Sequence, residues 1–361
     1  MTVRVPKYMA EDVRSVVLGA GLFDPERSIG RDREHVYLPV LLDSENESYL
    51  RSRLDSFENA SLISCTDMTP RRSFRLTPFE QIRERLKGEM DRKDLESLPG
   101  SWELLGDCLI IKNCDLDRRK LMKAAEVYKE VLGSRYVLLD RGGVSGELRS
   151  PDHLTLIPPE DGVKVTDHIE NGLIYRLDPS RIMFSSGNTA ERVRSGKYPV
   201  EYPTDSREEL VLDMFAGIGY FTMPVARSER VEKVLACEKN PLSHRFLREN
   251  VRLNDLGDKI LPVLGDNRKC LPEGFADRII MGYVGTTRDY LDSAISYLKP
   301  GGGIIHLHET VPGEVGVSGL ADDLGKKFRD LGWGFELLDG YRIKWYAPRI
   351  EHVVVHLALK K

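Results

Sequence analysis

The second half of the chain alternates short apolar runs with amphipathic stretches, and this rhythm begins near residue 200. The apolar runs predict strands at residues 210–214, 234–238, 260–264, 278–281 and 304–308, with helices between them. Strands that alternate with helices form a parallel sheet joined by crossover connections. Two later runs, 334–338 and 352–359, are so close in sequence that they predict an antiparallel hairpin closing the sheet. The pattern predicts an α/β fold over residues 191–361, with a doubly wound sheet.

Residues 1–62 predict a small α/β unit. Residues 10–18 have helical periodicity, residues 35–41 form an apolar run typical of a strand, and residues 45–57 are polar and helical. The unit contains no group with evident chemistry. We therefore expect it to contact a partner, not to catalyse.

Residues 81–190 predict a second, α+β unit. A helix is expected at residues 81–93, and an amphipathic helix at residues 116–132 that ends at Gly133. The expected strands are at residues 108–111, 136–139 and 173–177. Mixed strands around one or two helices favour a small layered unit that leads into the C-terminal domain.

The connector at residues 63–80 contains a basic cluster, Arg71, Arg72 and Arg75. Such a cluster is either a solvated linker or a phosphate contact. The formal net charge of −4 argues weakly against a nucleic-acid partner. A basic face can coexist with an acidic total, so the distribution of charge matters more than its sum.

Composition narrows the class of protein. Of the 361 residues, 41% are hydrophobic and 30% are charged, which is typical of globular domains. The sequence contains no apolar run of about 18 residues that would span a membrane. It does not begin with the apolar core of a signal peptide, so we expect a cytoplasmic protein. Its five cysteines include no CxxC pair, which predicts neither a zinc site nor a disulfide framework.

The strongest motif is Asp213-Met214-Phe215-Ala216-Gly217-Ile218-Gly219-Tyr220-Phe221, where a buried strand runs into a glycine turn. Glycines at such a turn let the backbone approach a ligand closely. A dinucleotide fingerprint would have a third glycine at the position of Thr222, which is absent here. The leading Asp213 is also foreign to that fingerprint, and it could pair with the amino end of a methionine moiety.

Polar residues follow the next two predicted strands as well. Glu238 ends the second strand, where a carboxylate can accept both hydroxyls of a ribose. Asp266 and Asn267 follow the third strand, where an acceptor and an amide could read the edge of adenine. Alone, Glu238 could be a surface acid and Asp266 a helix cap. Together at the carboxyl ends of parallel strands, they predict a binding crevice. This set resembles the class I S-adenosylmethionine (SAM)-dependent methyltransferase-like, Rossmann-like fold.

Other segments resemble archaeal and eukaryotic tRNA enzymes that act 3′ of the anticodon. The likeness is clear from about residue 98 onward and loose over the first 62 residues. It rests on residues 176–192 (RLDPSRIMFSSGNTAER), 167–172 (DHIENG) and 343–348 (IKWYAP). The group holds tRNA guanine N1-methyltransferases and wybutosine-pathway aminocarboxypropyltransferases. The resemblance implies SAM as cofactor and tRNA as partner, with tRNA-Phe as the candidate isoacceptor, and no membrane or obligate protein partner.

Two segments favour the aminocarboxypropyl branch of this group. After the fourth predicted strand the chain reads Met281-Gly282-Tyr283-Val284, where the methyltransferases carry an Asn-Pro-type motif. Gly282 would leave room for a bulky tricyclic base and a methionine chain. Residues 184–188 (FSSGN) also resemble that branch, whereas the methyltransferases carry Pro and Arg soon after Phe-Ser. The alternatives are the guanine methyltransferase and a tRNA-binding module of the same fold without catalysis.

The resemblance implies roles for individual residues. Phe184, Ser185 and Arg192 would line the methionine end of SAM, with Arg192 either binding its carboxylate or forming a surface ion pair. Tyr283 either stacks on the target base or packs in the core, and Arg192 and Tyr283 are the candidate catalytic residues. The candidate cofactor-binding residues are Phe184, Ser185, Arg192, Asp213, Phe215, Gly217, Gly219, Glu238, Lys239, Asp266, Asn267 and Gly282. His306 and His308 share a face of one strand, where hydrogen bonding is favoured over metal binding.

Overall fold

The structure is a computed structural model that describes residues 1–32, 34–64, 76–197 and 208–361. The chain forms two compact units, Met1–Gln81 and Ile82–Lys361. The predicted basic cluster, Arg71, Arg72 and Arg75, lies outside the described residues. The finer division expected from the sequence, at residues 62, 80 and 190, stays a prediction.

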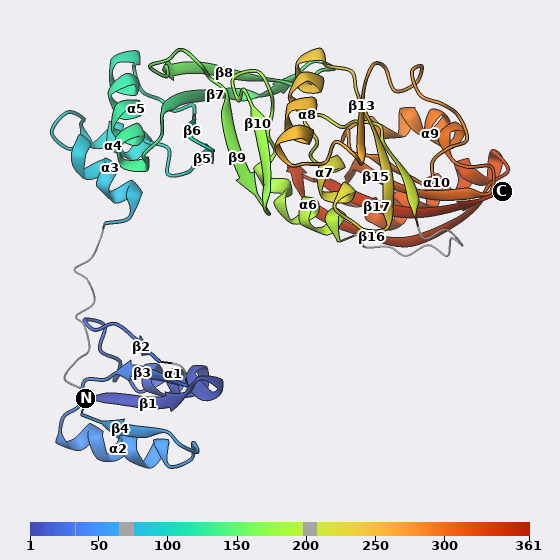
Figure 1. Ribbon diagram of the computed structural model, residues 1–361. Coiled ribbons are helices and arrows are strands. Elements are labelled where there is room, and N and C mark those ends of the chain that lie inside the picture. Colours follow the sequence, from blue (N-terminus) through green and yellow to red (C-terminus); the bar gives the residue numbers. More distant parts are fainter. Residues whose placement is uncertain (33, 65–75, 198–207) are drawn as a thin grey trace. The chain divides into compact units, whose positions relative to one another are not determined.

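The first unit is an antiparallel sheet with two helices (Figure 1). Its strands in spatial order are β2 (Gly30–Arg31), β3 (His35–Pro39), β1 (Thr2–Pro6) and β4 (Ser61–Ile63). The helices are α1 (Ala10–Gly19) and α2 (Ser44–Leu54), close to their predicted places. Val3 and Val5 of β1 pack against Val13 and Val17 of α1 in the core. The sequence pattern does not predict β1, because Arg4 interrupts its apolar residues and Pro6 ends it.

Three helices frame the start of the second unit. The single helix predicted at residues 81–93 is wrong, because the chain forms α3 (Pro78–Leu86) and α4 (Arg92–Ser97). The break follows from the capping of α4, where the Asp91 carboxylate accepts the Asp94 N–H at 2.9 Å. Helix α5 (Arg118–Leu132) is capped in the same way by Asp117. It ends at Gly133, whose φ of 67° is the left-handed conformation typical of a helix end.

These helices accompany a sheet in the order β5 (Trp102–Leu105), β6 (Cys108–Lys112), β7 (Tyr136–Ser145) and β8 (Ser150–Ile157). Strands β6 and β7 are parallel, and the other two pairs are antiparallel. A separate hairpin follows, made of β9 (Thr166–Glu170) and β10 (Leu173–Leu177). The sequence pattern does not predict β8 and β9, because polar residues interrupt their apolar positions.

The C-terminal part of the second unit is built on a seven-stranded sheet. Its spatial order is β13 (Ile260–Leu264), β12 (Val231–Glu238), β11 (Glu209–Asp213), β14 (Arg278–Met281), β15 (Gly302–Pro312), β17 (Ile350–Lys360) and β16 (Gly334–Ala347). The first five strands are parallel, whereas β17 and β16 form an antiparallel hairpin against β15. The predicted α/β class, parallel sheet and closing hairpin are confirmed.

Helices cover both faces of this sheet. Val211 of β11 joins a core that includes Phe246 of α8 (Pro241–Leu253), whereas the adjacent Leu212 joins the core on the other side. Besides α8, the helices here are α6 (Thr189–Gly196), α7 (Thr222–Ala226), α9 (Leu291–Tyr297) and α10 (Gly316–Asp330). The expectation of a helix in every crossover is wrong at residues 265–277, which form turns between β13 and β14. No helix in the described ranges is long and apolar enough to cross a membrane.

Candidate functional site

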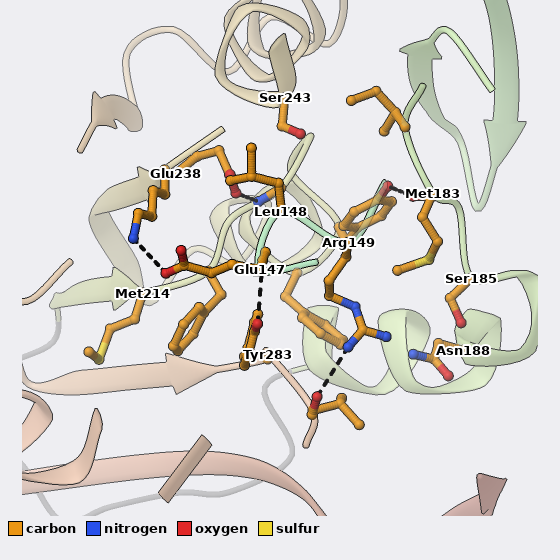
Figure 2. A pocket seen from close by; sticks show the side chains of 18 of the residues that line it. Glu147, Leu148, Arg149, Met183, Ser185, Asn188, Met214, Glu238, Ser243 and Tyr283 are labelled. Carbon is orange, nitrogen blue, oxygen red and sulfur yellow. Dashed lines mark hydrogen bonds and ion pairs between the residues drawn. The ribbon is translucent and has the colours of Figure 1, made fainter. Parts of the chain in front are cut away.

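A pocket of about 210 Å³ opens at the carboxyl ends of the central parallel strands (Figure 2). The loops after β11, β12, β13 and β14 all contribute to its lining. Strand β11 lies between β12 and β14, so the strand order reverses there. The sheet extends from β11 to β12 and β13 on one side and from β14 to β15 on the other. Such a switch point is where open α/β sheets bind ligands. The pocket therefore lies where the sequence pattern predicts the crevice.

The glycine turn after β11 depends on two different contacts. Gly217 has φ 58°, and a Cβ atom there would lie 2.7 Å from the ring of Tyr220. Its N–H donates to the Glu238 carboxylate at 2.7 Å, so the turn and the end of β12 hold each other. Gly219 has φ 102°, and a Cβ there would approach Met223 to 3.0 Å. Gly217 lines the pocket, whereas Gly219 serves the packing of the following helix.

Glu238 is held by backbone donors on both carboxylate oxygens. Besides Gly217, the N–H of Asn240 donates to it at 2.6 Å. Burial raises the pKa of this carboxyl group. Each carboxylate oxygen has two lone-pair sites, so capacity to accept further hydrogen bonds is left toward the pocket. The arrangement fits a ribose diol, the ligand assigned to Glu238 from the sequence.

Asp266 and Asn267 line the same pocket on the far side of β12. The Asp266 carboxylate is paired with Arg268 at 2.6 Å and with Lys239 at 3.3 Å, and the hydrogen bond from Arg268 holds its pKa well below the usual range. The Asn267 side-chain amide donates to the Met214 carbonyl at 2.6 Å. Its Oδ1 is buried and has no hydrogen-bond partner within the described residues. An unsatisfied buried acceptor fits the exocyclic amine of adenine.

Besides Gly219, two of the predicted residues, Asp213 and Phe184, lie behind the pocket wall and not in it. Asp213 is fully buried, accepts hydrogen bonds from Thr222 Oγ1 at 2.7 Å and Phe215 N at 3.1 Å, and does not line the pocket. Burial raises the pKa of Asp213 to about 6. Phe184 is packed edge-on against Tyr220, with ring centroids 5.5 Å apart. In the structure, both residues support the wall from behind.

Arg192 lines the pocket but already has an anionic partner. Its guanidinium donates to both carboxylate oxygens of Glu170, at 2.6 and 2.7 Å, and to the Ser185 carbonyl at 2.9 Å. Only 2% of the Arg192 side chain is exposed. The ion pair is therefore buried and not on a helix surface, and it fixes the loop that carries Ser185.

The segment after β14 brings aromatic rings to the pocket. Tyr283 is half-buried and stacks on Phe215, with ring centroids 5.1 Å apart. A Cβ atom on Gly282 would lie 2.9 Å from the ring of Phe221. The glycine therefore makes room for Phe221. Gly282 also lines the pocket, and its expected role of leaving space for the substrate base stays a prediction. Val284 has φ 63°, a strained conformation for a β-branched residue, and such strain is typical of functional loops.

The sequence pattern does not identify one wall of the pocket, the turn between β7 and β8. Glu147 of this turn forms an ion pair with Lys239 at 2.5 Å, and its carbonyl accepts a hydrogen bond from the Tyr283 hydroxyl at 3.3 Å (Figure 2). Arg149 donates to the Val284 carbonyl at 3.2 Å. A polar hairpin tip has the same sequence pattern as a solvated loop, so only the tertiary structure shows these contacts.

The two histidines of β15, His306 and His308, each contact a histidine of the adjacent strand β17. His306 contacts His356 and lies 2.7 Å from Arg278, and His308 lies 3.3 Å from His352. No group of three or more His, Cys, Asp or Glu side chains that could hold a metal occurs in the described part of the chain. For His306 and His308 the sequence allowed either hydrogen bonding or metal binding, and the structure shows hydrogen-bond contacts for both.

Cys237 and Cys270, which are distant in sequence, lie close together beside Gly265, a residue that lines the pocket. Their Sγ atoms are 3.5 Å apart, one on β12 and one in the turns after β13. Burial raises the pKa of the Cys237 thiol. A search for CxxC spacing misses this pair, because the two cysteines are 33 residues apart in sequence and meet only through the pairing of β12 with β13.

Three segments of the chain match known families. Residues 166–329 match the TRM5/TYW2 methyltransferase domain, and residues 82–157 match the TYW2 N-terminal domain. Residues 2–48 match the tRNA methyltransferase 5 N-terminal domain. A Pyrococcus horikoshii relative, tRNA(Phe) (4-demethylwyosine(37)-C(7)) aminocarboxypropyltransferase, is 40% identical over 282 residues, which cover 78% of this chain and 97% of the relative. The chain belongs to the TRM5/TYW2 family.

Solved structures of the TRM5/TYW2 family share this architecture. P. horikoshii TYW2 in complex with MeSAdo has a TM-score of 0.68 at 36% identity, covering 78% of this chain and 99% of that structure. Trm5b from Pyrococcus abyssi has a TM-score of 0.69 at 25% identity, covering 100% of this chain and 99% of that structure. The second unit of the chain thus contains the TYW2-type matches, at residues 82–157 and 166–329, whereas the first unit contains a Trm5-type match at residues 2–48.

Proposed function

We propose that this chain transfers the 3-amino-3-carboxypropyl group of SAM to the tricyclic guanine derivative 3′ of the anticodon in tRNA(Phe). The observation that carries the proposal is the similarity to a relative named for this reaction. The match is 40% identical and covers 97% of the relative's length. The pocket supports it with groups suited to each part of the donor. We assign Glu238 to the ribose, Asp266 and Asn267 to adenine, and Ser185 to the methionine end.

When bound, SAM would supply a sulfonium whose methionine γ-carbon is open to attack by the base carbon; the Cγ–S bond would break, methylthioadenosine would leave, and the base carbon would lose its proton to solvent. The chain contributes chiefly positioning, because the reacting atoms must be held in line about 3–3.5 Å apart. The Gly217 turn and Glu238 hold the nucleoside, and the loop fixed by Arg192 holds the amino-acid end. Tyr283, stacked on Phe215 at the pocket wall, offers a surface on which a base can stack.

The experiment follows the fate of two labels. tRNA that carries the tricyclic precursor base is incubated with SAM labelled with ¹⁴C in the carboxyl group or in the methyl group. We expect the carboxyl label to enter tRNA, the methyl label to stay in methylthioadenosine, and unmodified guanine to react poorly. Entry of the methyl label into plain guanine, with S-adenosylhomocysteine as product, would establish the guanine N1-methyltransferase instead. Failure to bind SAM would point to a binding module without catalysis.

The first unit is assigned to tRNA contact away from the target base. Its match at residues 2–48 lies outside both TYW2-type matches, so it is an addition to the catalytic core. Among the residues that the structure describes, those that line the pocket all belong to the second unit. A compact unit that adds nothing to the pocket is free to bind another part of the tRNA.

A further inference from the structure

Lys344 is a half-buried cation that lines the pocket without a carboxylate partner. It lies on β16, and its Nζ is 3.2 Å from Ser185 Oγ. It forms no ion pair within the described residues. Burial, followed by the nearby Arg192 and Arg149, lowers the pKa of its ammonium group. A desolvated charge of this kind is stabilised when an anion binds beside it.

Three carboxylates in or beside the pocket are already paired with cations, and a fourth, Glu238, is held by backbone N–H donors. Glu170 neutralises Arg192, and Glu147 pairs with Lys239. Asp266 pairs with Arg268 as well as with Lys239. Lys344 and Arg149 therefore leave an excess of positive charge at the end of the pocket nearest Ser185. The local charge balance calls for an anionic ligand at that end.

The loop of Ser185 approaches the Lys344 ammonium closely at a glycine. A Cβ atom on Gly187 would lie 3.0 Å from Lys344 Nζ, so a side chain there would crowd it. Asn188 in the same loop lines the pocket, and its Oδ1 is buried without a hydrogen-bond partner in the described ranges. The Asn188 acceptor suits the ammonium group of an α-amino acid, and the Lys344 cation suits its carboxylate. A phosphate would satisfy only the cation.

We propose that Lys344 and Ser185 bind the α-carboxylate of the donor's methionine chain, with Asn188 accepting from its ammonium group. This subsite rests on the proposed function, because it takes SAM as the donor. It replaces Arg192 as the carboxylate ligand and leaves Arg192 as a positioning residue. Fixing the far end of the chain at β16 orients the γ-carbon relative to the target base.

The test compares two ligands that differ by the amino-acid chain. Calorimetry measures binding of SAM and of methylthioadenosine, which lacks the carboxylate, to the full-length protein and to K344M. We expect K344M to weaken SAM binding about 10- to 100-fold and to change methylthioadenosine binding less than twofold, the range of one charge-assisted hydrogen bond. K344R should retain most of the SAM affinity. K326M is the matched control, because Lys326 is an exposed lysine of α10 outside the pocket lining.

A third ligand isolates the carboxylate. Decarboxylated SAM keeps the sulfonium and the ammonium group, so K344M and the unaltered protein should bind it equally well. Equal losses of SAM and methylthioadenosine would mean that Lys344 only supports the fold. Unchanged SAM binding with a raised KM for tRNA would mean that Lys344 meets a phosphate, and either result overturns the subsite. If the unaltered protein binds no SAM, the proposed function itself fails.

Discussion

Arg192 and Glu170 form a bidentate ion pair, with Nε to Oε1 at 2.6 Å and Nη2 to Oε2 at 2.7 Å. The pair joins α6 to β9, and the third arm of the guanidinium holds the Ser185 carbonyl. The sequence suggests Arg192 as a ligand of the donor carboxylate, but a guanidinium saturated in this way has little charge to offer. Its main effect is to fix the shape of the loop.

We therefore expect R192A to lower both stability and transfer. Breaking a buried ion pair leaves Glu170 uncompensated, which costs about 3–5 kcal/mol of unfolding free energy. Chemical denaturation of R192A, E170A and the double variant measures this cost. The double variant should lose less than the sum of the single losses, because it leaves no unpaired charge. Unchanged stability of R192A together with a tenfold loss of SAM affinity would show that Arg192 binds the carboxylate directly.

E238A should weaken binding of SAM and of methylthioadenosine by the same amount, about 2–3 kcal/mol each, because both ligands carry the ribose. This pattern is the opposite of the one expected for K344M. Calorimetry with the two ligands checks it. E232A is a suitable control, since Glu232 lies on the same strand and is exposed. Unaltered affinity of E238A for both ligands would remove Glu238 from the site.

Unfolding free energy should fall as the pH drops from about 6.5 to 4. Burial lowers the pKa of His352 and of His356 to about 4, so the folded state binds fewer protons than the unfolded state in this window. Each histidine can contribute up to about 3 kcal/mol to the loss. Asp213, with its pKa raised to about 6, acts in the opposite direction. Denaturation at several pH values measures the slope, which H356Q should flatten; a flat profile in the unaltered protein would contradict the burial of these imidazoles.

Deleting residues 1–62 should leave SAM affinity intact and weaken tRNA binding, because all of the described residues that line the pocket belong to the second unit. Filter binding and the KM for tRNA measure the second effect. An unchanged KM would show that the first unit does not meet tRNA. Charge reversal at Arg71, Arg72 and Arg75 should reduce the salt dependence of tRNA binding if these residues contact phosphates.

The sequence predicts those features that depend on the local pattern of residues. It does not predict contacts between residues that are far apart in the chain. The parallel strands and the closing hairpin follow from apolar periodicity, and Glu238 and Asn267 follow from the ends of those strands. The turn at Glu147 carries no local signal, and the segment 343–348 supports a family resemblance without placing the Lys344 ammonium in the pocket. The neighbours of these two residues in space are 92 and 159 residues away in sequence. The contact of Gly282 with Phe221 is also invisible in the local sequence, since the two residues are brought together only by the fold.

The hairpin of β7 and β8 sets a lower limit on the size of a working fragment. Residues 166–329, the part matched by the shared catalytic domain, contain neither Glu147 nor Lys344. An excised fragment with those bounds would keep the glycine turn but lose the ion pair to Lys239, the hydroxyl contact of Tyr283 and the strand that carries the free ammonium. Grafting this chemistry onto another scaffold would therefore require three separate stretches of chain, brought together in one unit.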